Sequence, residues 1–123
     1  MSDNLIVDKS FDFAISTIST IKIYKFLCEK NEYVLSKQLL RSGTSIGANI
    51  REAMDGQSKR DFLSKMNISL KEAKETEYWI ELMMETEYLN KALHSTYLND
   101  CKEICRILNS IVKSTKLSLS KEI

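Results

Sequence analysis

The sequence predicts an all-α protein that folds as a single up-down antiparallel four-helix bundle. The 123 residues contain no proline and only three glycines, whereas a chain rich in strands and tight turns needs more of both. Apolar residues recur every three or four positions along most of the chain, which is the period of one helix face. A chain of this length forms one domain and buries roughly two-thirds of its unfolded surface, enough for a core without disulfides.

Four helices are expected within the single domain 1–123, over residues 8–30, 34–55, 58–87 and 95–116. Residues 1–7 are expected to be a loose lead-in, after which Asp8 or Ser10 caps the first helix. The core-facing stripe of this helix is expected to hold residues spaced by three and four: Phe11, Ala14, Ile15, Ile18, Ile21, Tyr24 or Lys25, and Cys28.

The second helix combines an apolar stripe with two glycines. Gly43 and Gly47 lie four residues apart beside Ile46 and Ile50. Each glycine inside a helix costs roughly 1 kcal/mol relative to alanine, and close approach of another backbone is the usual compensation. We therefore expect this face to pack tightly on a neighbouring helix or subunit. The alternative is a kink, or an early helix end at Gly43.

The third helix carries more apolar surface than one bundle helix needs. Gly56 is expected to end the second helix with a positive φ, and Ser58 to cap the third helix with Asp61 three positions on. The main stripe is Leu63, Met66, Leu70, Ala73, Ile80 and Met84, and the second is Phe62, Ser69, Thr76, Trp79 and Met83. This width predicts burial on two sides and therefore oligomerisation, with Trp79 as a candidate packing or subunit contact.

Glu77 falls inside the main apolar stripe of the third helix. Burial of an unpaired carboxylate is expensive, so Glu77 is expected to form an ion pair. Arg41 or Arg51 of the second helix is the expected partner, because a guanidinium can bind a carboxylate through two hydrogen bonds. Such a pair would fix the helix register.

Basic residues gather at two places, although the net charge of the whole chain is only +1. Lys59, Arg60 and Lys65 lie at the start of the third helix. Residues 91–123 carry six basic and three acidic groups, and Lys102, Arg106 and Lys113 share one helix face, with Lys116 nearby. Both groups are candidate phosphate contacts, because nucleic-acid affinity scales with the cations engaged. The alternative is a basic face that only promotes solubility.

No constellation of residues predicts a reaction, a cofactor, a metal or a small-molecule substrate. The acidic run of the third helix lacks the Glu-x-x-His pairs of di-metal bundles, and spacings such as Lys71–Glu75 and Lys74–Glu77 favour a solvated, salt-bridged face. Cys101 and Cys105 share a helix face and are expected in the core, since His94 is the only histidine available for zinc. No stretch approaches the roughly 18 apolar residues of a membrane span, so a cytoplasmic protein is expected.

Two motifs resemble the small four-helix-bundle proteins encoded within intervening sequences of bacterial 23S ribosomal RNA genes, also called S23 ribosomal proteins. The motifs are SKQLLRSGTSIGANIREA at 36–53 and SKRDFLSKMNISLKEAKETEYW at 58–79. The resemblance implies an up-down bundle and, as in related proteins, ring-shaped pentamers. It extends to the accessory protein of diversity-generating retroelements, which works with a reverse transcriptase and nucleic acid.

The first functional hypothesis is a non-enzymatic, self-assembling bundle that binds RNA or a nucleic-acid-handling protein. The second is a structural or protein-interaction oligomer without a nucleic-acid role, which the near-neutral charge favours. An enzyme is the third, and the absence of a nucleophile or ligand constellation argues against it.

Overall fold

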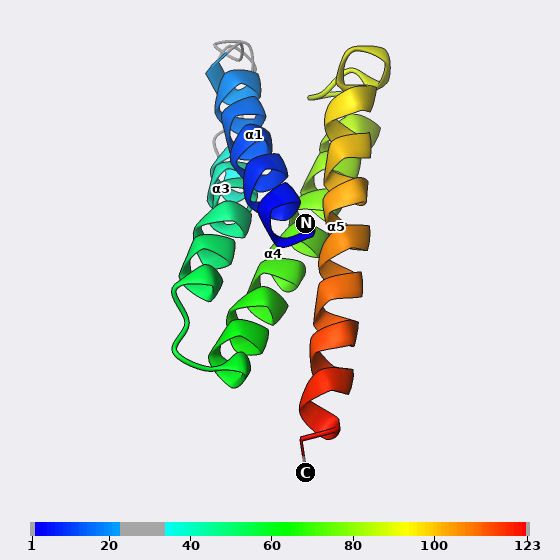
Figure 1. The fold of residues 1–123 in the computed structure, drawn as a ribbon. Coiled ribbons are helices and arrows are strands. Elements are labelled where there is room, and N and C mark those ends of the chain that lie inside the picture. Colours follow the sequence, from blue (N-terminus) through cyan, green and yellow to red (C-terminus); the bar gives the residue numbers. More distant parts are fainter. Residues whose placement is uncertain (1, 23–33, 123) are drawn as a thin grey trace.

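The computed structural model describes residues 2–22 and 34–122, and this part of the chain forms four α-helices (Figure 1). Their bounds are Ser2–Lys22 for α1, Val34–Met54 for α3, Lys59–Glu85 for α4 and Lys91–Ser120 for α5. Helices α1 and α4 each pack against both α3 and α5. The predicted all-α four-helix bundle is therefore confirmed.

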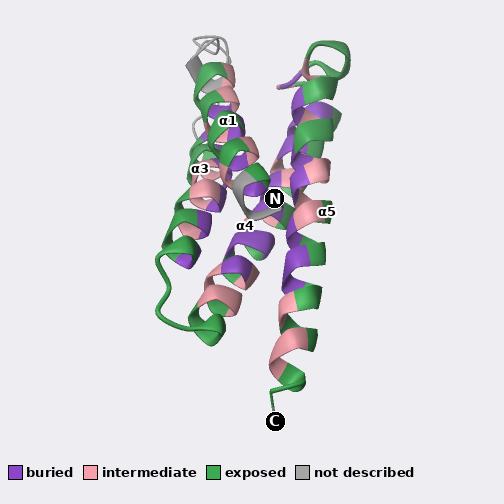
Figure 2. Ribbon diagram, in the orientation of Figure 1, coloured by how far each residue is buried: buried purple, intermediate pink, exposed green. Residues whose placement is uncertain are grey.

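Every helix contributes to one continuous core, and the buried segments face the inside of the bundle (Figure 2). The largest fully buried apolar side chains are Ile6, Leu39, Ile46, Ile50, Met66, Ile80, Met83, Ile104 and Leu108. The stripes of α3 and α4 lie where their periodicity predicts. None of the helices in residues 2–22 and 34–122 has both the length and the apolar character required to cross a bilayer.

Helix α4 uses both of its stripes inside one chain. Ser69 donates a hydrogen bond to the Ile46 carbonyl at 2.9 Å, and the hydroxyls of Thr76 and Ser42 share a hydrogen bond of 2.9 Å, so the second stripe faces α3. Ala73, on the main stripe, accepts a hydrogen bond from Cys101 of α5. The extra width of the apolar surface on α4 therefore reflects its two neighbouring helices and gives no separate indication of an oligomer.

Helix α1 differs from the sequence prediction in where it begins and in which face it buries. The helix begins at Ser2, so residues 2–7 are not a loose lead-in. Its buried face consists of Ile6, Ser10, Phe13 and Thr17, whereas three residues of the expected core stripe, Phe11, Ile15 and Ile18, are exposed. The expected helix end near Lys30, the turn after it, and the positions of Tyr24, Lys25 and Cys28 lie outside the described residues.

The small residues of α3 explain why α1 buries its more polar face. A Cβ atom built on Gly43 would lie 2.9 Å from the Thr17 hydroxyl oxygen, and one on Gly47 would lie 3.4 Å from the Ser10 carbonyl oxygen. Two helices that approach this closely need short side chains on both sides of the contact. Ser10 and Thr17 supply them, and each hydroxyl donates to a carbonyl of its own helix.

The turn between α3 and α4 matches one expectation and corrects another. Ser58 is the N-cap of α4, and its hydroxyl accepts a hydrogen bond from the Asp61 amide at 3.1 Å, as predicted. Gly56 does not have a positive φ. A Cβ atom at Gly56 would lie 3.0 Å from the Ala53 carbonyl oxygen, so the tight turn itself leaves little room for a side chain.

Helix α5 is longer than predicted at both ends. Asn90 caps it by accepting a hydrogen bond from the Leu93 amide at 3.0 Å, so the helix starts at Lys91 and not near Ser95 or Thr96. At the other end Lys59 binds both Ser118 and Glu122, and the helix continues to Ser120, beyond the expected end at residue 116. The C-terminal end of α5 extends beyond the turn between α3 and α4 (Figure 1).

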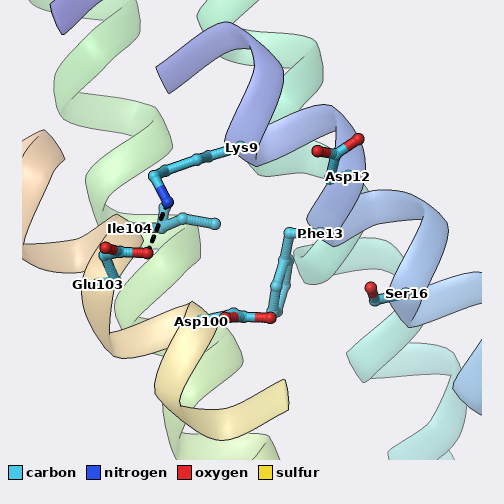
Figure 3. Close-up of a pocket in the computed structure, with 7 residues that line it drawn as sticks. All are labelled: Lys9, Asp12, Phe13, Ser16, Asp100, Glu103 and Ile104. Atoms are coloured by element: carbon cyan, nitrogen blue, oxygen red, sulfur yellow. Dashed lines mark hydrogen bonds and ion pairs between the residues drawn. The ribbon is translucent and has the colours of Figure 1, made fainter. Parts of the chain in front are cut away.

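Helices α1 and α5 meet through an aromatic stack and a small cavity. The rings of Phe13 and Tyr97 are parallel, with centroids 4.8 Å apart. Beside them lies a cavity of about 200 Å³, which Lys9 and Glu103 bridge with an ion pair of 2.8 Å (Figure 3). This contact raises the pKa of Lys9 and lowers the pKa of Glu103, chiefly through the hydrogen bond between them. The residues that line the cavity are Lys9, Asp12, Phe13, Ser16, Asp100, Glu103 and Ile104.

Candidate nucleic-acid interface on α4 and α5

Four cations form a row along α5, which we call the α5 basic stripe: Lys102, Arg106, Lys113 and Lys116. Their spacings of four, seven and three residues keep them on one side of the helix. The row is about 21 Å long at the usual rise per residue. Among the described side chains, none makes an ion pair with any of the four within 4 Å, although Arg106 is close enough to help lower the pKa of Glu103. Three of the predicted phosphate contacts therefore lie on one continuous surface.

The predicted phosphate contacts at the start of α4 differ from the α5 basic stripe, because most of them form ion pairs within the chain. Lys59 lies 2.6 Å from a Glu122 carboxylate oxygen, and Lys65 lies 3.5 Å from a Glu52 carboxylate oxygen. Arg60 is exposed and forms no ion pair with another described residue. Two of these three predicted residues therefore have their charge balanced within the chain, so this group is a weaker anion site than the α5 basic stripe.

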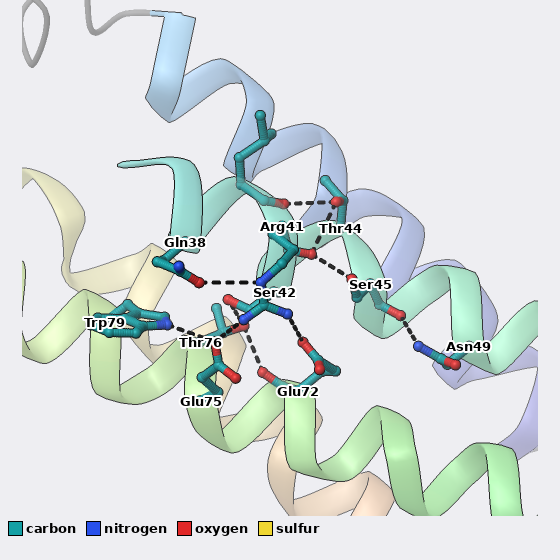
Figure 4. A network of polar contacts seen from close by, with 11 residues as sticks. Gln38, Arg41, Ser42, Thr44, Ser45, Asn49, Glu72, Glu75, Thr76 and Trp79 are labelled. Carbon is teal, nitrogen blue, oxygen red and sulfur yellow. Dashed lines mark hydrogen bonds and ion pairs between the residues drawn. The ribbon is translucent and has the colours of Figure 1, made fainter. Parts of the chain in front are cut away.

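A polar cluster joins α3 to α4 around Arg41 (Figure 4). The Arg41 guanidinium binds Glu72 at 3.0 Å and also Glu75, and Glu75 accepts a further hydrogen bond from the Trp79 indole at 2.8 Å. Gln38 completes the cluster by accepting from the Arg41 Nε at 3.2 Å. One cation on α3 thus holds two carboxylates of α4.

Two lysines of α4 lack the carboxylate partners that the sequence suggested. The sequence suggested that Lys71 pairs with Glu75 and that Lys74 pairs with Glu77. Glu75 binds Arg41 instead, and neither lysine forms an ion pair with a described residue. Lys71 and Lys74 are exposed one turn apart, and Lys74 is close enough to α5 to lower the pKa of Cys105. Lys74, which sequence reasoning assigned to a salt-bridged face, therefore lies near α5, and Lys71 lies one turn before it. Glu77 and Glu81 lie on the same side of α4, because both help to raise the pKa of Cys101.

The ion pair predicted between Glu77 and either Arg41 or Arg51 does not form. Arg41 binds Glu72 and Glu75, and the Arg51 guanidinium lies 4.8 Å from the centre of the Phe11 ring. Glu77 is half-buried on the side of α4 that faces α5, where it contacts Cys105. The periodicity located Glu77 at the edge of the core, but it did not show that this edge faces α5 and not α3.

Four of the residues expected to support close helix packing lie on the helix faces of one protomer that meet each other, and Trp79 lies at the edge of the core. Ile46 and Ile50 are fully buried, and Gly43 and Gly47 lie where α3 passes α1. Trp79 is half-buried beside Glu75, and its ring meets Tyr78 edge to face. The close packing is therefore between helices of one chain.

Of the two cysteines of α5, Cys101 lies in the core and Cys105 lies at its edge. Cys101 is fully buried and donates a hydrogen bond to the Ala73 carbonyl at 3.5 Å. Its hydrogen bond with Cys105, followed by burial, raises the pKa of Cys101, and the same hydrogen bond lowers the pKa of Cys105. In residues 2–22 and 34–122, no three His, Cys, Asp or Glu side chains are grouped so that they could hold a metal ion.

The fold and these contacts define an all-α four-helix bundle that carries a row of cations along α5. The chain belongs to the family described as 23S rRNA-intervening sequence protein, whose pattern matches residues 2–110. A solved structure from Bacteroides thetaiotaomicron, a protein of unknown function from the S23 ribosomal protein family, is 54% identical with a TM-score of 0.83. The match covers 92% of this chain and 99% of that one. No curated protein matches the chain.

Proposed function

We propose that this protein is a non-enzymatic, self-assembling helical bundle that binds RNA through the α5 basic stripe together with Lys71 and Lys74. The observation that carries the proposal is the contrast between these cations and four lysines elsewhere on the bundle. Lys9, Lys59, Lys65 and Lys91 each have a carboxylate partner in the chain, whereas those of the α5 basic stripe do not have one among the described residues. Unpaired cations in a row are available to bind phosphates.

The shape of the surface favours the nucleic-acid backbone over the bases. The α5 basic stripe is straight, because it follows one helix, and it contains no aromatic side chain that could stack on a base. A row of Lys and Arg residues binds phosphates without reading sequence directly. We therefore assign the stripe a backbone-binding role and expect little dependence on RNA sequence.

Self-assembly would strengthen this weak site. A single chain has a net charge of +1, so its long-range field attracts a polyanion only slightly. Several copies of the stripe in one assembly would act on one RNA molecule, and linked sites bind far more tightly than each does alone. The family resemblance implies a ring of five, and we propose that state for this chain. The odd cysteine count and the buried Cys101 thiol fit a reducing compartment, so we place the protein in the cytoplasm.

A structural or protein-interaction oligomer without an RNA role is the second candidate. The apolar residues exposed on α1, Phe11, Ile15 and Ile18, favour a protein contact in either case. The two candidates therefore differ only in what the α5 basic stripe does.

A charge-matched pair of variants tests the proposal. Lys102→Gln/Arg106→Gln/Lys113→Gln removes three cations that have no ion-pair partner, and Lys59→Gln/Lys65→Gln/Lys91→Gln removes three that have one. Titration of labelled single-stranded RNA, followed by fluorescence anisotropy at low salt, should show a loss of roughly tenfold or more for the first variant and a smaller loss for the second. Equal losses would mean that only net charge matters. A wild-type protein that does not bind would leave the structural oligomer as the function.

A further inference from the structure

Helix α1 carries apolar side chains on two opposite faces. Ile6 and Phe13 point into the core, whereas Phe11, Ile15 and Ile18 are 49%, 49% and 45% exposed. The exposed three are spaced by four and three residues, so they form one row along the outside of the helix. A helix that is apolar on both sides is normally covered on both sides.

A shallow groove continues this row onto α3. The groove has a volume of about 330 Å³, and small residues of both helices form much of its lining: Ser10, Ala14, Thr44, Gly47 and Ala48. Leu40 is exposed one turn before Thr44 on the same edge of α3. Arg51 lies over the Phe11 ring at one end of the groove. We call this surface the α1–α3 apolar face, with the members Phe11, Ala14, Ile15, Ile18, Leu40, Thr44 and Ala48.

We infer that a second copy of this chain covers the α1–α3 apolar face. The inference rests on the self-assembly part of the proposed function and assigns the surface that performs it. The apolar area of the face is close to what one partner contributes to a protein interface. The four large side chains and the small groove residues present on the order of 400 Å² of apolar surface. One side of a standard interface buries about 800 Å², of which roughly 56–65% is apolar, so the face supplies most of what one partner contributes.

The charge on and around the face suits a second copy of this chain better than a highly charged partner. The face contains no charged residue among its members, and Arg51 at its end already contacts Phe11. Asp8 and Asp12, both exposed on α1, lie at its margins. A polyanion would find no row of cations here, and a strongly basic partner would find only scattered carboxylates. A copy of the chain itself, with a net charge of +1 and both signs on its surface, can approach without strong repulsion.

Use of this face would leave the proposed RNA surface open. The α5 basic stripe lies on α5, near Lys74 of α4, whereas the α1–α3 apolar face lies on the other two helices. Assembly and RNA binding can therefore occur together. The two functions can also be separated by mutation.

The test compares two double variants by size-exclusion chromatography with light scattering. Ile15→Glu/Ile18→Glu places two charges on the face, and Leu93→Glu/Leu117→Glu makes the same change at exposed positions of α5. The wild type and the α5 variant should share one oligomeric mass, and the α1 variant should fall to the monomer mass of 14.2 kDa. An α1 variant that is folded by circular dichroism and keeps the wild-type mass would overturn the face assignment alone.

Two further outcomes complete the test. If the α1 variant does not fold, Ala48→Glu replaces it, because Ala48 is exposed on the α3 side of the groove. Glutamate is also compatible with a helix. Retention of the wild-type mass by a folded Ala48→Glu protein would count against the face in the same way. A monomeric wild type would overturn self-assembly itself, and with it this inference, whatever the RNA titration shows.

Discussion

The hydroxyl of Thr17 lies 2.7 Å from the phenol oxygen of Tyr97 in the buried seam between α1 and α5. Because the Thr17 hydroxyl donates to the Phe13 carbonyl at 2.9 Å, Tyr97 is the donor in the contact between the two hydroxyls. The Tyr97 ring also stacks on Phe13. One tyrosine therefore joins α5 to α1 through a hydrogen bond and through ring packing.

Tyr97→Phe should lower the free energy of unfolding by about 0.5–1.5 kcal/mol, because it removes one buried hydrogen bond and keeps the ring. The Thr17 hydroxyl retains its bond to Phe13, so no buried donor loses its acceptor. Urea unfolding followed by circular dichroism measures the change. Tyr97→Leu, which also removes the stack, should cost more, and equal losses for the two variants would contradict the role given to the ring.

The stability of the protein should fall at alkaline pH in a way that depends on Tyr97. Burial raises the pKa of Tyr97 above its ordinary value of 10. Below pH 10 the phenol is neutral in both states, and above it the unfolded chain ionises first, so the folded state loses stability as the pH rises. The slope should reach about 1.4 kcal/mol per pH unit. Unfolding at pH 8 to 11 should show this extra slope in the wild type relative to Tyr97→Phe. Parallel curves would contradict it.

Gly43→Ala should destabilise the protein, whereas Gly47→Ala should not. Both gain up to about 1 kcal/mol of helix propensity. The new Cβ at position 43 would overlap Thr17, at 2.9 Å from its oxygen and 3.0 Å from its methyl carbon, so a net loss of about 1–2 kcal/mol is expected. At position 47 the nearest atoms are 3.4 Å away, and no loss is expected. Adding Thr17→Ser should recover part of the Gly43→Ala loss in thermal unfolding, because it removes the methyl group.

The two cysteines of α5 should differ in reactivity. The shared hydrogen bond and burial raise the pKa of Cys101, whereas that of Cys105 is lowered. In a Cys28→Ser background, a thiol reagent at neutral pH should modify one group per native chain, and Cys105→Ser should abolish that reaction. Fast modification of Cys101 in the folded protein would contradict the packing described for α5.

The sequence was sufficient for the bundle and for most of α3, α4 and α5, because their apolar residues repeat with a regular helical period. It misplaced α1, because Phe11, Ile15 and Ile18 are more apolar than the face that packs on Gly43 and Gly47. Hydrophobicity alone favoured burial of the Phe11 face of α1. The close approach of α3 at its small residues instead requires the face of α1 that has short side chains.

The candidate interface was predicted in part for a similar reason. The spacing of Lys102, Arg106 and Lys113 gave their common face directly. Lys71 and Lys74 were missed because the spacing within α4 suggested that Glu75 and Glu77 neutralise them. Only the fold shows that Arg41, which lies 31 residues before Glu72 in the chain, binds Glu72 and Glu75.

The salt dependence of RNA binding by the wild-type protein tests the central claim most directly. The four cations of the α5 basic stripe alone, engaged on a single strand, predict a slope of about −3 for the logarithm of the binding constant against the logarithm of the salt concentration. Anisotropy titrations between about 50 and 200 mM salt give this slope. A slope of about −3 or steeper would support a surface that binds the RNA backbone. A slope near zero, or no binding at the lowest salt concentration, would contradict it.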